Sequence, residues 1–431
     1  MLTVTTLVGC SGGSSSTSQT SGRAGTSASS ASSGTTGASP SGGTSTTGAS
    51  STASPSGSSG SSGSNSATGT TSSTGTDPTT ASCIDALAAR MTPAQRAGQL
   101  IMVGLDRSMS ASSLDAMIAQ HHIGNMFFIG GWRDAATVRQ ATAHVQAQVS
   151  PTSTAGVRFL VAADQEGGQV QQLKGAGFTP LPSALQQGSM SAADRARIAA
   201  TIATELKAVG VNLDLAPVAD TVPPDNPRSN EPIGRWGRQY ANDPTKAATA
   251  VSEVVRTMQA GGLQTALKHF PGLGRVTGNT DFTSAGIVDS TTTADDQYLD
   301  PFAAGIASGS GVVMMSSAYY SRMDPANQAV YSPTIIGTVL RGKLGFSGVV
   351  VSDDLNAVAV RGVPAGERAV RFVRAGGDIA LTGLASAAPV MARALVTQAA
   401  NDPAFAAKVD ASVKRVLTIK TRAGLTSCSA G

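Results

Sequence analysis

The stretch GLQTALKHFPGLGRVTGNTDFTSAGIVD, residues 262–289, decides how the rest of the chain is interpreted. It begins with an apolar run, residues 263–267, which is typical of a buried strand and leads directly to Lys268 and His269. A long loop rich in glycine, threonine and asparagine follows, without a helical or strand period. A buried strand that delivers a cation and an imidazole into an irregular loop is typical of a functional site on a parallel α/β scaffold.

Short apolar segments alternate with helical patterns on both sides of this stretch. The predicted strands are residues 99–104, 123–128, 158–163, 211–215, 263–268, 311–316, 348–352 and 378–382. They are apolar throughout rather than alternating, which favours a parallel sheet covered on its outer face. This count of strands and helices predicts an α/β protein with one domain, a (β/α)8 TIM barrel. A doubly wound open sheet is the alternative.

A low-complexity segment precedes these elements. Residues 11–81 are almost entirely Ser, Thr, Gly, Ala and Pro, with Arg23 and Asp77 as the only charges. Such a segment cannot bury enough apolar surface to offset the entropy of ordering it, so we expect a disordered tether. The folded domain is expected over residues 82–428.

The first ten residues suggest how the tether is attached. Leu7-Val8-Gly9-Cys10 resembles a bacterial lipobox, in which Cys10 would carry the lipid. The charged region that opens a signal peptide is missing before it, so residues 1–10 have the form of a truncated signal. We expect a lipoprotein at the outer face of the cell membrane or envelope, or a secreted protein.

The remaining cysteines, Cys83 and Cys428, bracket the predicted domain. In an exported protein they are expected to form a disulfide that ties the two ends of the domain together. Two buried free thiols are the alternative.

Composition argues against several other classes of function. The net charge of +4 is mild, and no Lys/Arg cluster with interleaved aromatic residues marks a nucleic-acid site. No apolar run is long enough for a transmembrane helix. The four histidines and three cysteines form no metal-ligand pattern, so we predict no metal and no other cofactor. A monomer is the default expectation.

Polar side chains follow several of the predicted strands. Asp164 follows the third, Asp214 ends the fourth, Lys268 and His269 follow the fifth, and Asp353 follows the seventh. An aspartate at such a position is often only a helix cap. Because the carboxyl ends of barrel strands meet on one face, however, we expect these side chains to form one pocket suited to a polyhydroxylated ligand.

The motifs at these strand ends resemble those of glycoside hydrolase family 3, in its single-domain β-N-acetylhexosaminidase branch. The matching segments are KHFPGLG (268–274), DQEGG (164–168), NLDLAPVAD (212–220), IG with RQYA (233–234, 238–241), VSDDL (351–355) and AGGD (375–378). They occur in family order over the whole predicted domain. The resemblance implies a retaining glycoside hydrolase that removes terminal β-linked N-acetylglucosamine from cell-wall-type glycans.

The same resemblance implies roles for individual residues. Asp353 matches the nucleophile that forms a glycosyl-enzyme. Asp164, Arg238, Lys268 and His269 match residues that hydrogen-bond the hydroxyls and the N-acetyl group of the sugar.

The chain departs from the family at the acid/base. This branch uses a histidine paired with an aspartate in a D-S-H triplet, and here the triplet is Asn279, Thr280 and Asp281. Leu273 replaces a second histidine, in the signature itself. The expected catalytic dyad is therefore absent.

Three interpretations are open. Asp281 replaces the histidine as acid/base, kept protonated by burial or by proximity to Asp353. Alternatively, the protein is a catalytically impaired, envelope-tethered sugar-binding protein. In the third, Asp281 only binds ligand or caps the loop, and water or substrate supplies the proton. Gln169 and Gln172 stand where the family has arginines, so a β-glycosidase with changed sugar specificity is a further possibility.

Overall fold

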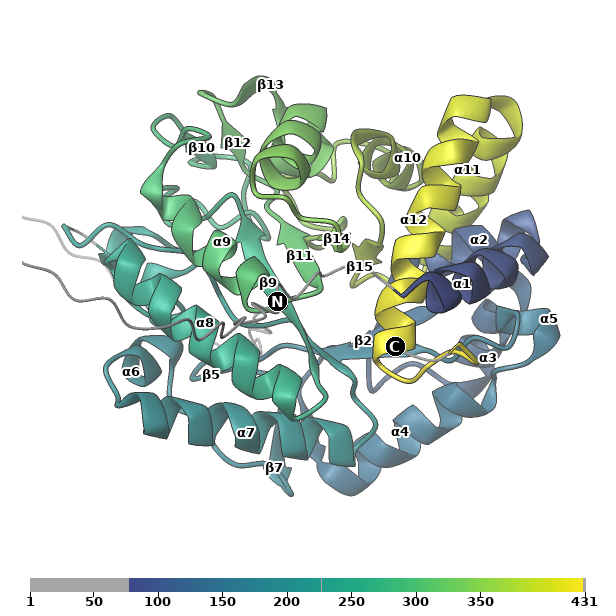
Figure 1. The fold of residues 1–431 in the computed structure, drawn as a ribbon, viewed down its shortest axis with the longest axis horizontal. Coiled ribbons are helices and arrows are strands. Elements are labelled where there is room, and N and C mark those ends of the chain that lie inside the picture. Colours follow the sequence, from purple (N-terminus) through teal and green to yellow (C-terminus); the bar gives the residue numbers. More distant parts are fainter. Residues whose placement is uncertain (1–76, 226, 429–431) are drawn as a thin grey trace, which may run out of the picture. The chain divides into compact units, whose positions relative to one another are not determined.

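The structure, a computed structural model, describes residues 77–225 and 227–428 (Figure 1). Its main sheet has eight strands in the order β14-β11-β9-β8-β4-β2-β1-β15. Every pair within it is parallel, and a bridge between Val351 and Ile379 joins β14 to the segment that enters β15, which closes the sheet. The predicted (β/α)8 barrel is therefore confirmed, and the open doubly wound sheet was the wrong alternative.

Each predicted strand corresponds to one barrel strand. The strands are β1 (Ile101–Leu105), β2 (Asn125–Phe128), β4 (Leu160–Ala163), β8 (Leu213–Asp214), β9 (Gln264–Phe270), β11 (Val312–Met315), β14 (Val349–Ser352) and β15 (Ala380–Thr382). All their residues are buried because side chains fill the barrel on one face and helices cover the other.

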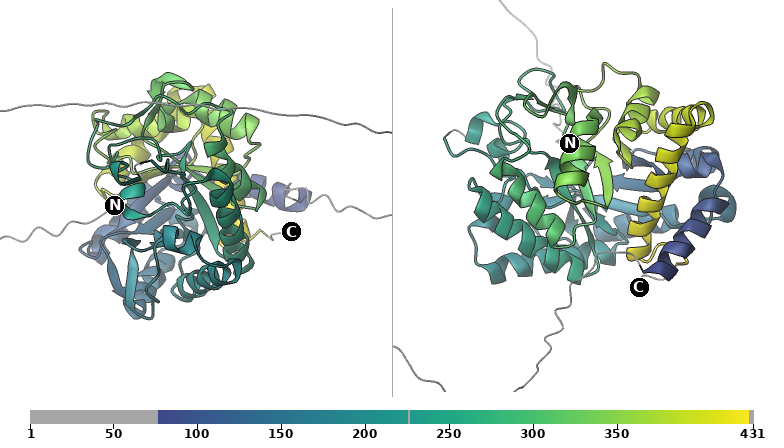
Figure 2. Two further views of the ribbon diagram at one scale, coloured as in Figure 1. Left: turned by 90° about the vertical axis from the view of Figure 1, so that its left-hand side faces the viewer. Right: turned by 45° about the horizontal axis from the view of Figure 1, so that its top comes forward.

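Helices lie outside the strands (Figure 2). They are α1 (Pro78–Arg90), α2 (Pro93–Gln99), α3 (Ala111–His121), α4 (Ala135–Ala147), α5 (Pro151–Thr154), α6 (Ala184–Gly188), α7 (Ala192–Ala208), α8 (Pro244–Ala260), α9 (Asp300–Ala307), α10 (Ala365–Ala375), α11 (Ala387–Asn401), α12 (Pro403–Arg422) and the π-helical η5 (Thr334–Lys343). Their starts follow the sequence signals: Ser191 caps α7, and Asp243 with Pro244 opens α8.

Short strands and 3₁₀ turns are built into the loops. The strands are β3 (Trp132–Asp134), β5 (Gln165–Gly167), β6 (Val170–Gln171), β7 (Leu173–Ala176), β10 (Val288–Asp289), β12 (Tyr319–Tyr320) and β13 (Asp324–Gln328). The turns are η1 (Pro227–Ser229), η2 (Gly234–Trp236), η3 (Gln297–Leu299) and η4 (Ala329–Tyr331). Their pairs, such as β5 with β6, give the loops a fixed path.

The described domain begins earlier than the predicted boundary at residue 82. Helix α1 starts at Pro78, because the Asp77 side chain accepts hydrogen bonds from the backbone N–H groups of Thr79 and Thr80, at 3.0 and 3.1 Å. Asp-Pro is a helix-start signal that the surrounding low complexity obscured. Cys10 and residues 11–76 of the expected tether lie outside the described residues, so lipidation and tether stay predictions.

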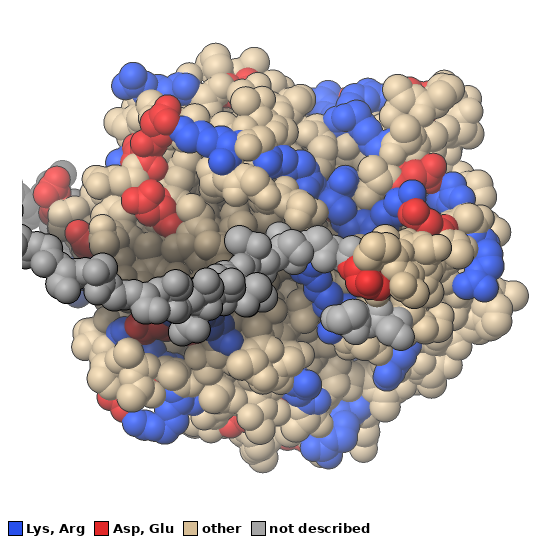
Figure 3. Space-filling model, in the orientation of Figure 1, with Lys and Arg blue, Asp and Glu red and all other residues tan. Residues whose placement is uncertain are grey.

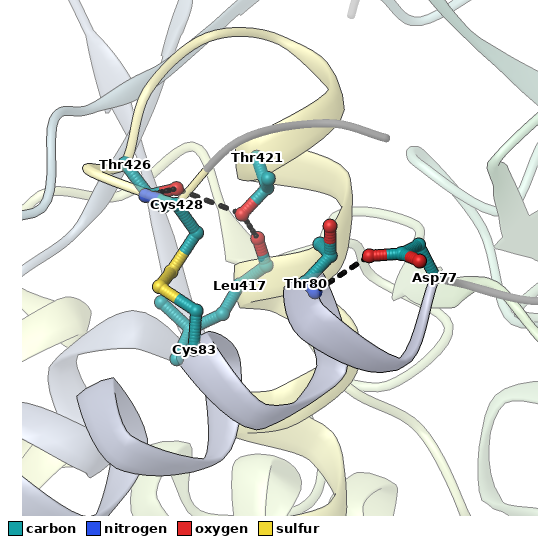
Figure 4. The surroundings of a disulfide bond; sticks show 7 residues. All are labelled: Asp77, Thr80, Cys83, Leu417, Thr421, Thr426 and Cys428. Atoms are coloured by element: carbon teal, nitrogen blue, oxygen red, sulfur yellow. Dashed lines mark hydrogen bonds between the residues drawn. A yellow bond between two sulfur atoms is a disulfide. The ribbon is translucent and has the colours of Figure 1, made fainter.

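A disulfide joins the two ends of the domain, as predicted. Cys83 of α1 is bonded to Cys428, which follows α12, with their Cα atoms 5.8 Å apart (Figure 4). Close by, the Thr421 hydroxyl donates to the carbonyl of Leu417 within α12. The bond therefore fixes α1 against α12, far along the chain but adjacent in the fold.

The surface carries charge of both signs. On the face shown in Figure 3, Lys and Arg side chains occur in short groups among uncharged side chains and Asp or Glu. Among the described residues, no helix combines the length and apolar character needed to span a membrane.

Candidate active site

A pocket, here called the central pocket, lies where barrel strands end and comprises about 590 Å³ of space, open solvent at its mouth included. Its lining residues are Phe127, Asp164, Val170, Leu215, Pro232, Arg238, Lys268, His269, Leu273, Asn279, Thr280, Asp281, Met314, Asp353, Asp354 and Leu381. The six residues predicted from the sequence as catalytic or sugar-binding are all in this set. The structure thus brings them together, although Lys268 and His269 lie in β9 and the other four come from loops after different strands.

Lys268 is the centre of a charge cluster in this pocket. Its side chain is almost fully buried, and its Nζ lies 2.5 Å from Asp164 Oδ1 and 2.6 Å from Glu166 Oε1. Burial alone would lower the pKa of Lys268, but the two carboxylates raise it above its usual value. The lysine is therefore a cation held in one position by two anions.

Arg238 completes the cluster by binding both carboxylate oxygens of Glu166, including the Oε1 that Lys268 also contacts. Its Nε and Nη2 donate to the two carboxylate oxygens of Glu166, at 2.9 and 2.8 Å, and its Nη1 donates to the Pro232 carbonyl at 2.8 Å. Burial would raise the pKa of Glu166, but Arg238 and Lys268 hold it well below its usual range. Two of the five guanidinium N–H groups remain for a ligand.

Glu166 belongs to the motif at residues 164–168, but the sequence did not predict it as a site residue. It reaches the cluster because the chain reverses immediately after it, between β5 and β6. Gly167 has φ +101°, and a Cβ there would lie 2.2 Å from the Pro182 carbonyl oxygen, so the turn requires glycine. In the sequence, the two adjacent glycines after Glu166 were the signal that could have indicated this turn.

His269 is oriented by a second carboxylate that the sequence did not single out. Its Nδ1 lies 2.7 Å from Asp220 Oδ2, while Asp220 Oδ1 accepts from the backbone N–H groups of His269 and Leu273, at 3.0 and 2.8 Å. With Nδ1–H donating to Asp220, Nε2 is the ring nitrogen left for a ligand in the pocket.

Three carboxyl groups meet on the β14 side of the central pocket: Asp353, Asp354 and Asp281. Asp353 Oδ1 accepts from the Asp354 N–H at 2.9 Å. Burial raises the pKa of Asp353, His269 opposes that shift, and Asp281 adds to it. Burial also raises the pKa of Asp354, to about 6.

Asp281 is held beside Asp353 by contacts between two loops. Its backbone carbonyl accepts from the Val358 N–H at 3.2 Å, and the carbonyl of Thr280 accepts from the Ala359 N–H at 3.1 Å. The loop after β9 is thereby attached to the segment after β14. Leu273 also lines the pocket, as do Asn279 and Thr280, whereas Gln169 and Gln172, the other departures from the family, are not among its lining residues.

The remaining histidines lie away from the pocket. His121 ends α3, His122 follows it, and His144 is on α4, where it pairs with Asp115 at 2.7 Å. His269 is thus the pocket's histidine. Within residues 77–225 and 227–428, no group of three or more His, Cys, Asp or Glu side chains is arranged to hold a metal ion.

Comparisons with known proteins agree with this geometry. Residues 93–419 match the Glycosyl hydrolase family 3 N terminal domain. The chain is 39% identical over 212 residues to a β-hexosaminidase of Xylella fastidiosa (strain M23), covering 48% of this chain and 61% of that protein. It is 38% identical over 232 residues to a β-hexosaminidase of Stenotrophomonas maltophilia (strain R551-3), covering 52% and 66%. The matches thus span less than two thirds of these relatives.

Among solved structures, the fold is similar to a β-N-acetylhexosaminidase from Beutenbergia cavernae DSM 12333. The TM-score is 0.73 at 43% identity, covering 77% of this chain and 98% of that one. A glycoside hydrolase family 3 β-N-acetylglucosaminidase from Paenibacillus sp. str. FPU-7 gives a TM-score of 0.70 at 28% identity, covering 79% of this chain and 64% of that one.

Proposed function

The chain belongs to glycosyl hydrolase family 3, and from this premise we propose that it is a retaining glycosidase that removes terminal β-linked N-acetylhexosamine, in particular N-acetylglucosamine, from cell-wall-type glycans. One observation carries the proposal. Asp353 follows β14, and the Lys268 cluster reaches the same pocket from β9 and from β4, which lies four strands away and hence across the barrel. A pyranose bound between them would place its hydroxyls at the cluster and its anomeric carbon at Asp353.

The reaction would proceed in two displacements. The free oxygen of the Asp353 carboxylate attacks the anomeric carbon while the leaving oxygen takes a proton from Asp281, which gives a glycosyl-enzyme. Asp281, now a carboxylate, then takes a proton from water, and the hydroxide oxygen attacks the anomeric carbon and releases Asp353. During both steps, Lys268 holds the sugar by charge-assisted hydrogen bonds and His269 holds it by a hydrogen bond from its imidazole ring.

Asp281 is the proposed proton donor because it shares the pocket with Asp353 and occupies the loop where the family carries its acid/base. Mutual repulsion among three carboxyl groups favours one of them staying protonated. Asp354, with its raised pKa of about 6, is the competing donor, although its Oδ1 accepts from the N–H groups of Asn356 and Gly383.

A second function, sugar binding without turnover, is favoured by one specific observation: Asn279, Thr280 and Asp281 line the pocket where the family has a histidine dyad. A β-glycosidase with changed sugar specificity is the third candidate. All three functions require a sugar to bind in the central pocket. They differ in whether a glycoside is hydrolysed and in which one.

The deciding experiment is hydrolysis of 4-nitrophenyl β-N-acetylglucosaminide and 4-nitrophenyl β-glucoside. The protein should hydrolyse the first substrate, Asp353→Ala should abolish that activity, and Asp225→Ala, an exposed control outside the pocket, should retain it. Hydrolysis of the glucoside alone would identify a changed specificity. Binding of N-acetylglucosamine by a folded protein with no hydrolysis of either substrate would establish the binding function.

We further propose that the protein acts as a monomer at the outer face of the cell membrane or envelope, anchored through a lipid on Cys10, or is secreted. The lipobox-like residues before Cys10 and the Cys83–Cys428 disulfide support an exported protein, because disulfides persist in oxidising compartments. Cells given an alkyne-tagged fatty acid should label the protein, and Cys10→Ser should prevent the labelling. Membrane release on that substitution would confirm the anchor, whereas unchanged labelling would exclude it.

A further inference from the structure

A second cavity, here called the rim cavity, opens near the central pocket, around the ends of β1, β2 and β15. It encloses about 890 Å³ of space that is open to solvent. It is lined by Gly104, Asp106, Ser108, Met109, Ser110, Ser113, Ile129, Gly383 and Ala385. None of these residues lines the central pocket, although the Gly383 N–H donates to Asp354, which does.

The rim cavity continues the central pocket outward along the same strands. Phe127 and Leu381 line the central pocket, and Ile129 and Gly383, each two residues further on, line the rim cavity. Ile129 and Gly383 lie just beyond the last residues of β2 and β15, so the rim cavity lies outward of the central pocket at these two strand ends. The Gly383 N–H also donates to Asp354 Oδ1, at 3.0 Å, so the walls of the two cavities are directly bonded.

The position of the rim cavity matches the direction in which a leaving group must point. Asp353 follows β14, whose neighbours in the barrel are β11 on one side and β15 on the other. The proposed sugar-binding cluster lies beyond β11, after β9 and β4. In the in-line displacement the leaving group departs on the side of the anomeric carbon opposite Asp353, and the rim cavity follows β1 and β2, which are two and three strands away from β14.

The lining chemistry indicates what kind of leaving group fits. Asp106 Oδ1 accepts from the backbone N–H and hydroxyl of Ser108, at 2.8 and 2.6 Å, and Oδ2 has no hydrogen bond within the described part of the chain. Ser110 and Ser113 also line this cavity, with the Ser110 hydroxyl donating to that of Ser113 at 2.8 Å, and no Lys or Arg lines it. A half-buried carboxylate with a free oxygen favours a donor such as a sugar hydroxyl and repels an anion.

We propose that the rim cavity is the subsite for the leaving sugar, and that it takes a neutral, hydroxyl-rich pyranose whose hydroxyl donates to Asp106. This inference rests on the proposed function. It predicts that the protein prefers β-linked oligosaccharides with a neutral leaving sugar, such as chitobiose, over disaccharides whose leaving sugar carries a free carboxylate.

The test compares two substrates that differ in the leaving group alone. Asp106→Ala should lower kcat/KM for chitobiose about tenfold, the effect of losing one hydrogen bond to a charged group. It should leave kcat/KM for 4-nitrophenyl β-N-acetylglucosaminide unchanged, because the aryl group has no hydroxyl donor. Ser112→Ala is the matched control, since Ser112 contacts Ser110 at 3.2 Å but does not line the cavity, and it should change neither value.

A second variant covers the possibility that Asp106→Ala disturbs the loop. Asp106→Asn keeps the shape and removes the charge, and it should raise kcat/KM for a disaccharide ending in N-acetylmuramic acid relative to chitobiose. Equal losses on both substrates in a folded Asp106→Ala, or no loss on either, would overturn the subsite.

Failure of the proposed function would be distinguishable. If the native protein hydrolyses neither substrate, binding of chitobiose and of N-acetylglucosamine is measured by calorimetry on the same variants. Tighter binding of the disaccharide that Asp106→Ala removes would support the subsite without catalysis. Equal affinity for the two sugars would reject it.

Discussion

Neutralising Glu166 is the sharpest test of the charge cluster. Its side chain is 2% exposed and serves two cations at once, receiving two hydrogen bonds from Arg238 and lying 2.6 Å from Lys268 Nζ. In Glu166→Gln, the Asp164 carboxylate alone remains in the cluster with the two buried cations. Removing one partner from a buried ion pair costs about 3–5 kcal/mol, and we expect the free energy of unfolding at pH 7 to fall by that amount.

The pH dependence gives a second, independent signature. The folded-state pKa of Glu166 lies below its ordinary value of 4.5, so its stabilising contribution is complete above pH 4.5 and is lost as the pH falls toward the folded pKa. The difference in unfolding free energy between native protein and Glu166→Gln should therefore be constant near neutral pH. It should narrow by about 1 kcal/mol between pH 4.5 and 3.5.

Urea unfolding followed by tryptophan fluorescence measures both quantities. Glu231→Gln is the matched control, because Glu231 forms an exposed pair with Arg235, and such pairs contribute about 0.5 kcal/mol or less. A Glu166→Gln protein as stable as the Glu231→Gln control would refute the reasoning. So would a stability difference that widens as the pH falls.

Three further predictions address the acid/base, the disulfide and the buried Lys420. Asp281→Asn should lower kcat for chitobiose about a hundredfold or more but change hydrolysis of a 2,4-dinitrophenyl glycoside little, since a good leaving group needs no proton; equal losses would reject Asp281 as the acid. Cys83→Ser with Cys428→Ser should lower the free energy of unfolding by about 2–4 kcal/mol without changing kcat, because the bond lies between α1 and α12, and an unchanged urea midpoint would contradict this. Lys420 is buried with its Nζ 2.6 Å from Gln99 Oε1, and burial lowers its pKa well below 10.5. The free energy of unfolding of the native protein should therefore rise as the pH rises toward 10.5, and that of Lys420→Met should lack this rise. If the free energies of unfolding of both proteins change equally with pH, Lys420 does not have a lowered pKa.

The barrel was predictable because its signals are local. Each strand is a short apolar run bounded by turn residues, and helix starts such as Ser191 and Asp243 carry their caps within one turn of chain. Helix α1 was missed because its start, Asp77-Pro78, lies in a segment whose composition predicts no packed structure. Its packing against α12 and the Cys83–Cys428 bond supply the order that composition does not.

The lining of the site was also largely predictable, because parallel strands deliver their carboxyl ends to one face. Sequence motifs were enough to gather Asp164, Lys268, His269 and Asp353 into one pocket. The expectation was wrong for Asp214, which does not line the pocket: it is fully buried, and its Oδ1 accepts from the Gln165 N–H at 3.0 Å. The roles of Glu166 and Asp220 were not predictable in this way. Both belong to sequence motifs, but no motif shows which side chain each of them pairs with.

Thus the sequence by itself determined the fold class, the strands that carry the site, the disulfide and the loss of the histidine dyad. Tertiary structure alone decided which charges pair: Lys268 meets Asp164 across 104 residues of chain, and His269 meets Asp220 across 49. It also decided that the loop bearing Asp281 lies against the segment after Asp353, and that a second cavity continues the pocket over β15 and β1. The physical reason is that such contacts depend on strand order and loop path, which no local pattern of residues specifies.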